Sequence, residues 1–181
     1  QFPENDKTTE LSLEDVINKL RPLFEDDSIK FCGQNIKYDA LVMLRYGIQL
    51  NGIIFDTMIA AHLIRPDLST LKLDTLSQLY LSYRMCPIED LIGTGSNQKT
   101  MDKVPLDEIS FYAAEDADVA LQLTEILGES LKDEDMEIPF NEVEIPLIPV
   151  LIKMESNGVY LDLEFLSELS ADFGQKMEGI K

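Results

Sequence analysis

Tryptophan is absent from this 181-residue sequence, and cysteine and histidine are rare. The two cysteines, Cys32 and Cys86, lie far apart and belong to no CxxC pair or Cys/His cluster. This argues against a zinc site and a disulfide framework, and a reduced cytoplasmic compartment is the simplest expectation. The single histidine, His62, lies in the apolar run 58–64, so we expect a packed or surface position and no catalytic role.

Long apolar runs are also missing. No stretch approaches the roughly 18 residues that a membrane-spanning helix needs, so we expect no membrane partner. Residues 1–6 carry neither the basic leader nor the apolar stretch of a signal peptide. They also lack an initiator methionine, and we interpret the sequence as an internal piece of a longer chain.

Basic residues are few: 15 Lys and Arg stand against 34 Asp and Glu, which gives a net charge of −19. Taken alone, this charge argues against nucleic-acid binding, because phosphate contacts need Lys and Arg. A site that uses divalent cations must itself be acidic, however. The charge therefore does not exclude phosphate chemistry.

Local signals predict alternating strands and helices. Helices are predicted from the cap Ser12 through Leu23, then over 35–46, 57–64, 73–81, 106–131 and 143–155, and from 163 onward; strands are predicted at 29–32 and 52–55, an extended piece at 159–161, a loop at 92–98 and an acidic linker at 132–137. This alternation predicts an α/β fold. Two strands before residue 150 are too few for a stable sheet, which indicates that strands are missing upstream.

The predicted long helix carries a carboxylate on its inward face. Helical spacing gives an inward stripe of Ile109, Ala113, Asp116, Ala120, Leu123, Leu127 and Leu131. A buried, unpaired Asp116 needs a cation, a hydrogen-bond partner or a raised pKa. Tyr112 lies one turn earlier on the same face. Glu115 and Asp118 fall off the stripe and are expected to be solvated. Spacing alone leaves open that Asp116 is only an interior hydrogen-bonded group.

A second candidate site lies at the start of the helix that follows the first predicted strand. Asn35 and Asp39 are one turn apart on one face, at a strand-to-helix junction that suits a ligand site in an α/β fold. The residues alone favour a plainer interpretation, in which Asn35 caps the helix and Asp39 is a surface acid.

Together these segments resemble a known family. Residues 33–39 (GQNIKYD) and 112–118 (YAAEDAD) resemble the second and third exonuclease motifs of family A DNA polymerases. Segments 55–58, 73–76 and 89–98 follow the same pattern in order, and 144–159 resembles the junction into the polymerase region. The resemblance covers about residues 12–165.

The resemblance implies a ribonuclease H-like 3′→5′ exonuclease fold whose N-terminal strands are absent from this chain. It implies proofreading: removal of nucleotides from a single-stranded DNA 3′ end with two Mg²⁺ (or Mn²⁺) ions. Asp116 and Asp39 would be metal ligands, and both are expected to be catalytic with Tyr112, which would position the attacking water. Gln34, Asn35 and Tyr38 match positions that bind the terminal nucleotides. The implied domains are 1–138, the exonuclease, and 139–181, the start of the polymerase region, which would be a partner in the same parent chain.

One departure matters most. The family's first motif, an Asp-x-Glu on the opening strand, is not found before Gly33. Residues 56–58, 135–137 and 162–164 are poor substitutes by position or composition. Since this motif supplies two of four metal carboxylates, we expect the isolated chain to be nearly inactive. We also expect the first strand to expose an edge, which another copy or an upstream piece would cover.

Three other interpretations stay open at this stage. A ribonuclease D-like exoribonuclease would share both carboxylate motifs. A non-catalytic scaffold domain of a family A polymerase would have lost carboxylates that are present here. A plain acidic interaction domain would follow from charge alone.

Overall fold

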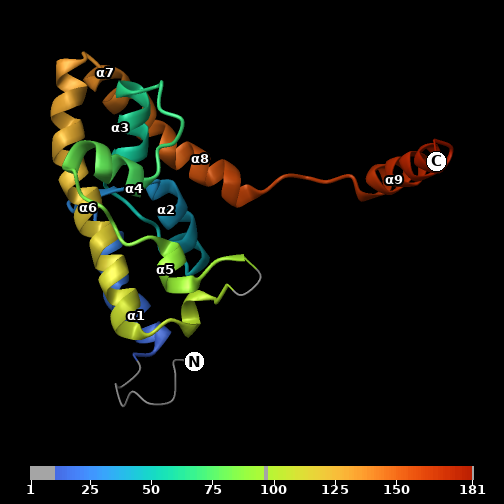
Figure 1. Cartoon of the computed structure of the whole chain (residues 1–181), viewed down its shortest axis with the longest axis horizontal. Helices are drawn as coiled ribbons and strands as arrows, with labels where there is room; N and C mark the ends of the chain where they lie inside the picture. The colour runs from blue at the N-terminus through green and yellow to red at the C-terminus, as the bar shows by residue number, and fades with distance from the viewer. Residues whose placement is uncertain (1–10, 96–97, 181) are drawn as a thin grey trace.

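The computed structural model describes residues 11–95 and 98–180 and contains mostly helices around a small sheet (Figure 1). The helices are α1 (Leu13–Phe24), α2 (Ile36–Arg45), α3 (Thr57–Ile64), α4 (Leu73–Leu76), α5 (Ile88–Ile92), α6 (Leu106–Asp133), α7 (Glu137–Pro139), α8 (Ile145–Asn157) and α9 (Leu163–Glu178); the short turns are the π-helical η1 (Ser77–Leu81) and η4 (Phe140–Glu144) and the 3₁₀ turn η3 (Met101–Lys103). The strands are β1 (Phe31–Gly33) and β2 (Ile53–Asp56). The predicted α/β alternation is confirmed. Residues 1–8 and part of the predicted 92–98 loop lie outside the described residues.

The two strands run parallel, with Cys32 opposite Phe55 and Gly33 opposite Asp56. Parallel pairing follows from the helical crossover α2 that joins them. Gly52 makes the entry into β2 possible: its φ is +65°, and a Cβ there would lie 2.0 Å from the carbonyl oxygen of Ile29. Within the described residues β1 pairs only with β2, so its other edge is open.

The core lies where α3, α6 and the start of the 140–157 segment meet one face of the sheet. Its buried members are Phe55, Ala60, Ala61, Leu76, Met85, Val119, Leu123, Leu127, Leu131 and Phe140. The rings of Phe55 and Phe140 lie 4.8 Å apart between centroids. Burying one such aromatic side chain contributes about 1.5–3 kcal/mol. On the other side, α8 packs against α2 and β2.

Residues 132–137 were predicted to form a linker, but they do not separate the residues after them from the core. Helix α6 runs on to Asp133, and a tight turn with Asp135 at φ +56° leads directly into α7. Phe140 and Ile148, which follow this turn, are 1% and 2% exposed. The acidic residues predicted a linker because they are solvated, but the apolar residues after them reach back to the same core. The domain boundary at 138/139 stays a prediction.

Helix α1 begins at its predicted cap, where the Ser12 hydroxyl accepts a hydrogen bond from the backbone N–H of Asp15 at 3.0 Å. Two apolar residues of this helix are not buried, since Leu20 is 37% and Leu23 50% exposed. That another copy or an upstream piece covers these leucines and the open edge of β1 stays a prediction.

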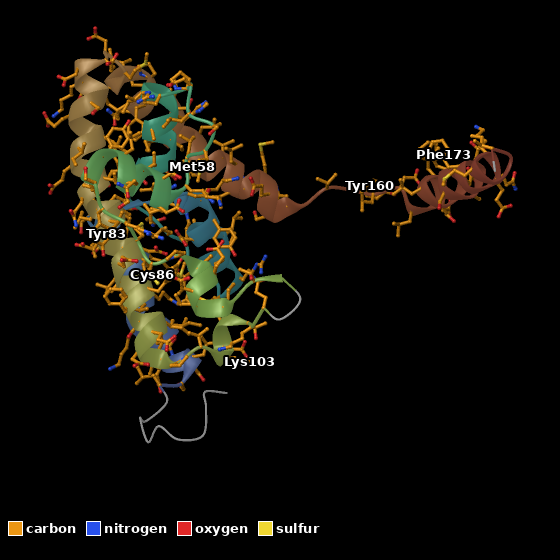
Figure 2. The ribbon with its side chains drawn as sticks, in the orientation of Figure 1. Met58, Tyr83, Cys86, Lys103, Tyr160 and Phe173 are labelled. Atoms are coloured by element: carbon orange, nitrogen blue, oxygen red, sulfur yellow. The ribbon has the colours of Figure 1, made fainter. Side chains whose placement is uncertain are left out.

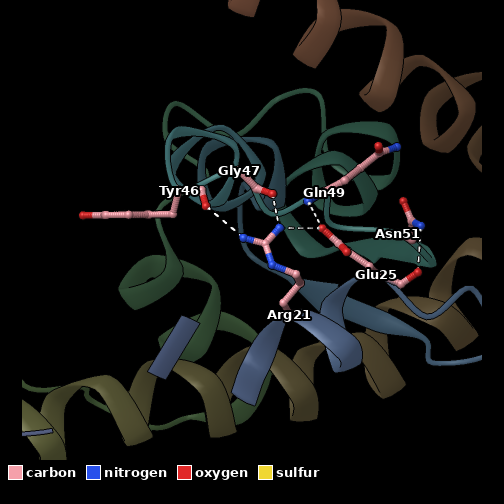
Figure 3. Close-up of polar contacts among 6 residues, drawn as sticks. All are labelled: Arg21, Glu25, Tyr46, Gly47, Gln49 and Asn51. Atoms are coloured by element: carbon pink, nitrogen blue, oxygen red, sulfur yellow. Dashed lines mark hydrogen bonds and ion pairs between the residues drawn. The ribbon is translucent and has the colours of Figure 1, made fainter. Parts of the chain in front are cut away.

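Arg21 of α1 ties this helix to the end of α2 (Figure 3). Its guanidinium donates to the backbone carbonyls of Gly47 and, at 3.3 Å, of Tyr46, and pairs with Glu25 at 3.1 Å. The Glu25 carboxylate also accepts from the backbone N–H of Gln49. A cation at this position satisfies the carbonyls of the two residues that follow α2 and interacts favourably with the helix dipole.

Helix α9 stands apart from the rest of the chain at the end of an extended segment (Figure 1). Asp162 caps it by accepting from the N–H of Phe165 at 3.0 Å. The Asp162–Glu164 pair is therefore used at a helix start, away from the other candidate residues. No helix within the described ranges is long and apolar enough to span a bilayer.

Asp56 joins the sheet to two helices. Its carboxylate is 1% exposed and accepts from four backbone N–H groups: Asn35 and Ile36 at the start of α2, and Met58 and Ile59 at the start of α3. Burial raises the pKa of Asp56, while these four donors act in the opposite direction. One side chain thus caps both helices.

We predict that Asp56→Ala lowers the free energy of unfolding by at least about 3 kcal/mol, because it leaves several buried N–H groups without an acceptor. Urea denaturation followed by circular dichroism measures this. Asp67→Ala is the matched control, since the Asp67–Arg65 pair is exposed and screened by solvent, so its loss should change the free energy of unfolding little. Equal unfolding midpoints for the two variants would contradict the role given to Asp56.

Candidate active site

A cavity of about 610 Å³ opens between the carboxyl end of β1, the start of α2, the segment before α4 and the first half of α6. Its lining residues are Cys32, Gly33, Gln34, Asp39, Lys72, Leu73, Asp74, Met85, Cys86, Pro87, Ile88, Glu89, Tyr112, Ala113, Asp116, Ala117 and Ala120. Ligands of α/β proteins bind outside the carboxyl ends of parallel strands, and this cavity lies there.

The two carboxylates singled out in the sequence share this cavity. Asp39 reaches it from the first turn of α2, and Asp116 from the middle of α6. Asp39 is exposed, as the plainer interpretation of a surface acid expects, but it also lines this cavity. The capping role predicted for Asn35 is wrong, because its side chain makes no capping hydrogen bond and Asp56 supplies the acceptor. Asn35 instead adopts the left-handed conformation, with φ +55°.

Asp39 and Asp116 both have pKa values raised above that of a free aspartate side chain. Desolvation and the nearby Asp56 carboxylate raise the pKa of Asp39. Desolvation and the neighbouring Glu115 raise the pKa of Asp116, and hydrogen bonding from Tyr112 partly offsets that rise. Two negative groups with raised pKa values on one cavity wall would gain most from a bound cation.

Tyr112 lines the same cavity one turn before Asp116. Desolvation and the charge of Asp116 raise the pKa of its hydroxyl. The hydroxyl therefore stays protonated at neutral pH, and it can donate a hydrogen bond into the cavity.

Glu115 was expected to be solvated, and this is wrong. It is 9% exposed, and its two oxygens accept from the Tyr83 hydroxyl at 2.7 Å and from the backbone N–H of Cys86 at 2.9 Å. Tyr83 and Cys86 lie beside α6 (Figure 2). Glu115 therefore fastens the 85–89 wall of the cavity to the helix that carries Asp116. Asp118, by contrast, is exposed as expected.

The inward stripe of α6 is partly different from the prediction. Ala120, Leu123, Leu127 and Leu131 are buried, but Ala113 is exposed on the cavity wall and the buried Val119 lay off the predicted stripe. The first half of α6 faces the cavity with one side and the 83–86 segment with the adjoining side. Asp116 consequently faces a cavity and not an apolar sheet.

Gln34 lines the cavity, but both ends of its amide are used inside the protein. Its Nε2 donates to the carbonyl of Leu71 at 2.7 Å, and its Oε1 accepts from the Thr57 hydroxyl. Asn35 and Tyr38 are not among the lining residues, and Tyr38 is 63% exposed. The predicted substrate-binding residues thus lie around the cavity, with Gln34 in its wall and Tyr38 outside it.

The donor set fits a divalent cation only in part. Within 11–95 and 98–180, no three His, Cys, Asp or Glu side chains converge closely enough to hold a metal ion. Asp39 and Asp116 offer oxygen donors, and Asp74 and Glu89 line the same cavity. Mg²⁺ is commonly held by one or two carboxylates together with substrate phosphates, and the residues present fit that mode. Cys32 and Cys86, both free thiols, are poor donors for such an ion.

A family model described as 3′-5′ exonuclease, of A-type DNA polymerases, matches residues 5–132. The chain belongs to this exonuclease family. It is 35% identical over 166 residues to DNA polymerase I of Rhizobium leguminosarum, covering 92% of the chain, and 37% identical over 172 residues to that of Chloroflexus aurantiacus, covering 93%. It spans only 16% and 18% of the lengths of these two enzymes.

Solved structures of similar fold cover most of this chain. The POL domain of Pol1 from M. smegmatis, in complex with DNA primer-template and dNTP, matches 95% of this chain and 26% of its own with a TM-score of 0.73 at 23% identity. Brucella melitensis NrnC with bound Mg²⁺ matches 77% of this chain and 64% of its own with a TM-score of 0.60 at 18% identity. These likenesses concern the fold alone, and together with the match to the exonuclease family model they confirm the predicted ribonuclease H-like class.

We predict that Glu115→Ala lowers the free energy of unfolding by about 2 kcal/mol and that Tyr83→Phe lowers it by less, because Glu115→Ala removes both hydrogen bonds of this carboxylate and Tyr83→Phe removes one. The double variant should lose less than the sum of the two, since both act on one interaction. Thermal denaturation of the four proteins measures this cycle. Strict additivity would show that the Tyr83 hydroxyl and the Glu115 carboxylate do not interact in the folded chain.

We predict that Asp39→Asn and Asp116→Asn each stabilise the chain at pH 7, by up to about 1 kcal/mol after solvent screening. The sign follows from linkage: a carboxyl whose folded pKa is raised holds its proton more tightly when folded, so stability increases as pH falls through that pKa toward 3.8. The advantage of the variants should therefore vanish below about pH 4. Asp118→Asn, on the exposed side of α6, is the control and should change stability by about 0.5 kcal/mol or less. Loss of stability in both cavity variants at pH 7 would contradict the electrostatics.

Proposed function

We propose that this cavity is the site at which the parent enzyme hydrolyses the terminal phosphodiester of a DNA 3′ end. The observation that carries the proposal is that Asp39, Tyr112 and Asp116, far apart in sequence, line one cavity. Membership of the exonuclease family supports it.

In this proposal Asp116 and Asp39 are the metal ligands that the chain contributes to two Mg²⁺ or Mn²⁺ ions. When bound, such ions supply Lewis-acid stabilisation of the scissile phosphate and lower the pKa of an attacking water. The unfavourable ionisation of both carboxylates without a cation supports this role. Tyr112, protonated at neutral pH, orients the attacking water by hydrogen bonding.

The terminal nucleotides would lie against the start of α2. Tyr38, exposed and aromatic, offers a face on which a base can stack. Asn35 has a left-handed backbone, and its side chain makes no capping hydrogen bond. This side chain is the proposed polar contact to the terminal nucleotides. For Gln34 the internal hydrogen bonds favour an indirect role, in which it holds the cavity wall.

The isolated 181-residue chain should be nearly inactive. It supplies two of the motif carboxylates, and no third ligand converges with them in the described residues. Further residues of the parent protein would complete the coordination shell and cover the open edge of β1, a position that another copy of the chain could also occupy. The polymerase region is the other proposed partner, and a cytoplasmic location fits this role.

Two alternative functions can be separated experimentally. The fold likeness to NrnC favours a ribonuclease D-like exoribonuclease as the second candidate. A non-catalytic scaffold is disfavoured, because Asp39, Tyr112 and Asp116 are all present and meet in one cavity.

We predict that the parent enzyme degrades single-stranded DNA from its 3′ end in Mg²⁺, faster than RNA of the same sequence, and that this chain alone is at least about 10³-fold slower, because half of the ligand set is absent. Gel assays on 5′-labelled strands measure both rates. Asp116→Ala in the parent is expected to abolish degradation, while Asp118→Ala leaves it unchanged. Preference for RNA would favour the second candidate, and full activity of the isolated chain would refute the missing-ligand argument.

A further inference from the structure

The charge balance of the cavity is one-sided. Its lining includes four carboxylates, from Asp39, Asp74, Glu89 and Asp116. Among the described lining residues, Lys72 is the one basic side chain. A polyanionic strand entering this cavity therefore meets one basic side chain among the described lining residues, that of Lys72.

The backbone around Lys72 is held in place from both sides. The carbonyl of Leu71 accepts from the Gln34 amide at 2.7 Å, which ties this segment to the end of β1. The carbonyl of Lys72 itself accepts from the N–H of Leu76 at 3.0 Å, the first bond of α4. Lys72 therefore projects from a fixed position between the β1–α2 junction and α4, although its side chain is exposed and long.

Lys72 makes no ion pair with a described residue, in contrast to Lys37. Lys37 lies two residues before Asp39, but it pairs with Glu155 of α8 and so belongs to the α2–α8 contact. An unpaired ammonium group beside four carboxylates retains its attraction for an incoming phosphate. Lysine binds phosphates as a mobile point charge, which suits a backbone contact without sequence preference.

We propose that Lys72 binds a backbone phosphate of the single strand that enters the cavity. It is a substrate-binding residue that opposes the repulsion between the acidic chain and the strand. This inference rests on the proposed function, since it takes the cavity to be the nuclease site.

The test uses the parent enzyme with a 5′-labelled oligo-dT strand in Mg²⁺. Lys72→Ala is expected to raise KM about five-fold with kcat changed less than about two-fold, and to reduce the slope of log(kcat/KM) against log salt by about 0.7, the value for one lost phosphate contact on a single strand. Lys72→Arg should restore both. The control Lys103→Ala removes an exposed lysine that does not line the cavity and should change neither quantity.

The outcomes separate this inference from the proposed function. If the unmodified parent does not degrade the strand, the proposed function fails, and the role of Lys72 fails with it. If the parent is active but Lys72→Ala leaves KM and the salt slope unchanged, only the role of Lys72 is overturned. A lower kcat at unchanged KM would likewise overturn it, because it would show that Lys72 only neutralises the cavity carboxylates.

Discussion

A single buried carboxylate organises the part of the chain that carries the candidate chemistry. Asp56 ends β2 and accepts from the first N–H groups of α2 and α3, so its position sets where both helices start. Asp39 lies in the first turn of α2 and reaches the cavity only because that turn is held there. The same negative charge raises the pKa of Asp39. Asp56 thus contributes to both the geometry and the electrostatics of the site.

The second wall of the cavity depends on a comparable contact. Glu115 binds Tyr83 and Cys86, and it lies next to Asp116 on α6. Each structural carboxylate therefore stands close to a candidate catalytic one and raises its pKa. The chain holds negative charges together at a cost in stability, and a divalent cation would relieve that cost. Under the proposed function, such a cation would also reduce the repulsion between this acidic chain, with its net charge of −19, and a nucleic-acid strand.

Most helices and strands could be predicted because they depend on residues that are close together in the sequence. Ser12 marks the start of α1 through its own side chain, and the period of α6 follows from its apolar residues. The missed features depend on partners distant in sequence. Glu115 is buried by Tyr83 and Cys86, and the carboxylate that caps α2 comes from β2. Asp39 and Asp116 became a joint site only through resemblance, because spacing cannot show that two helices face one cavity.

The central claim is that Asp39 and Asp116 gather divalent ions in one cavity, and weak binding to this chain suffices to test it. Paramagnetic broadening of amide NMR signals by Mn²⁺ is the most direct measurement. The account predicts that residues 33–39, 72–74 and 112–117 broaden first, and that the Asp39→Asn, Asp116→Asn double variant loses this effect. Broadening confined to the acidic end of α6 around Glu129 and Asp133, unchanged in the double variant, would contradict it.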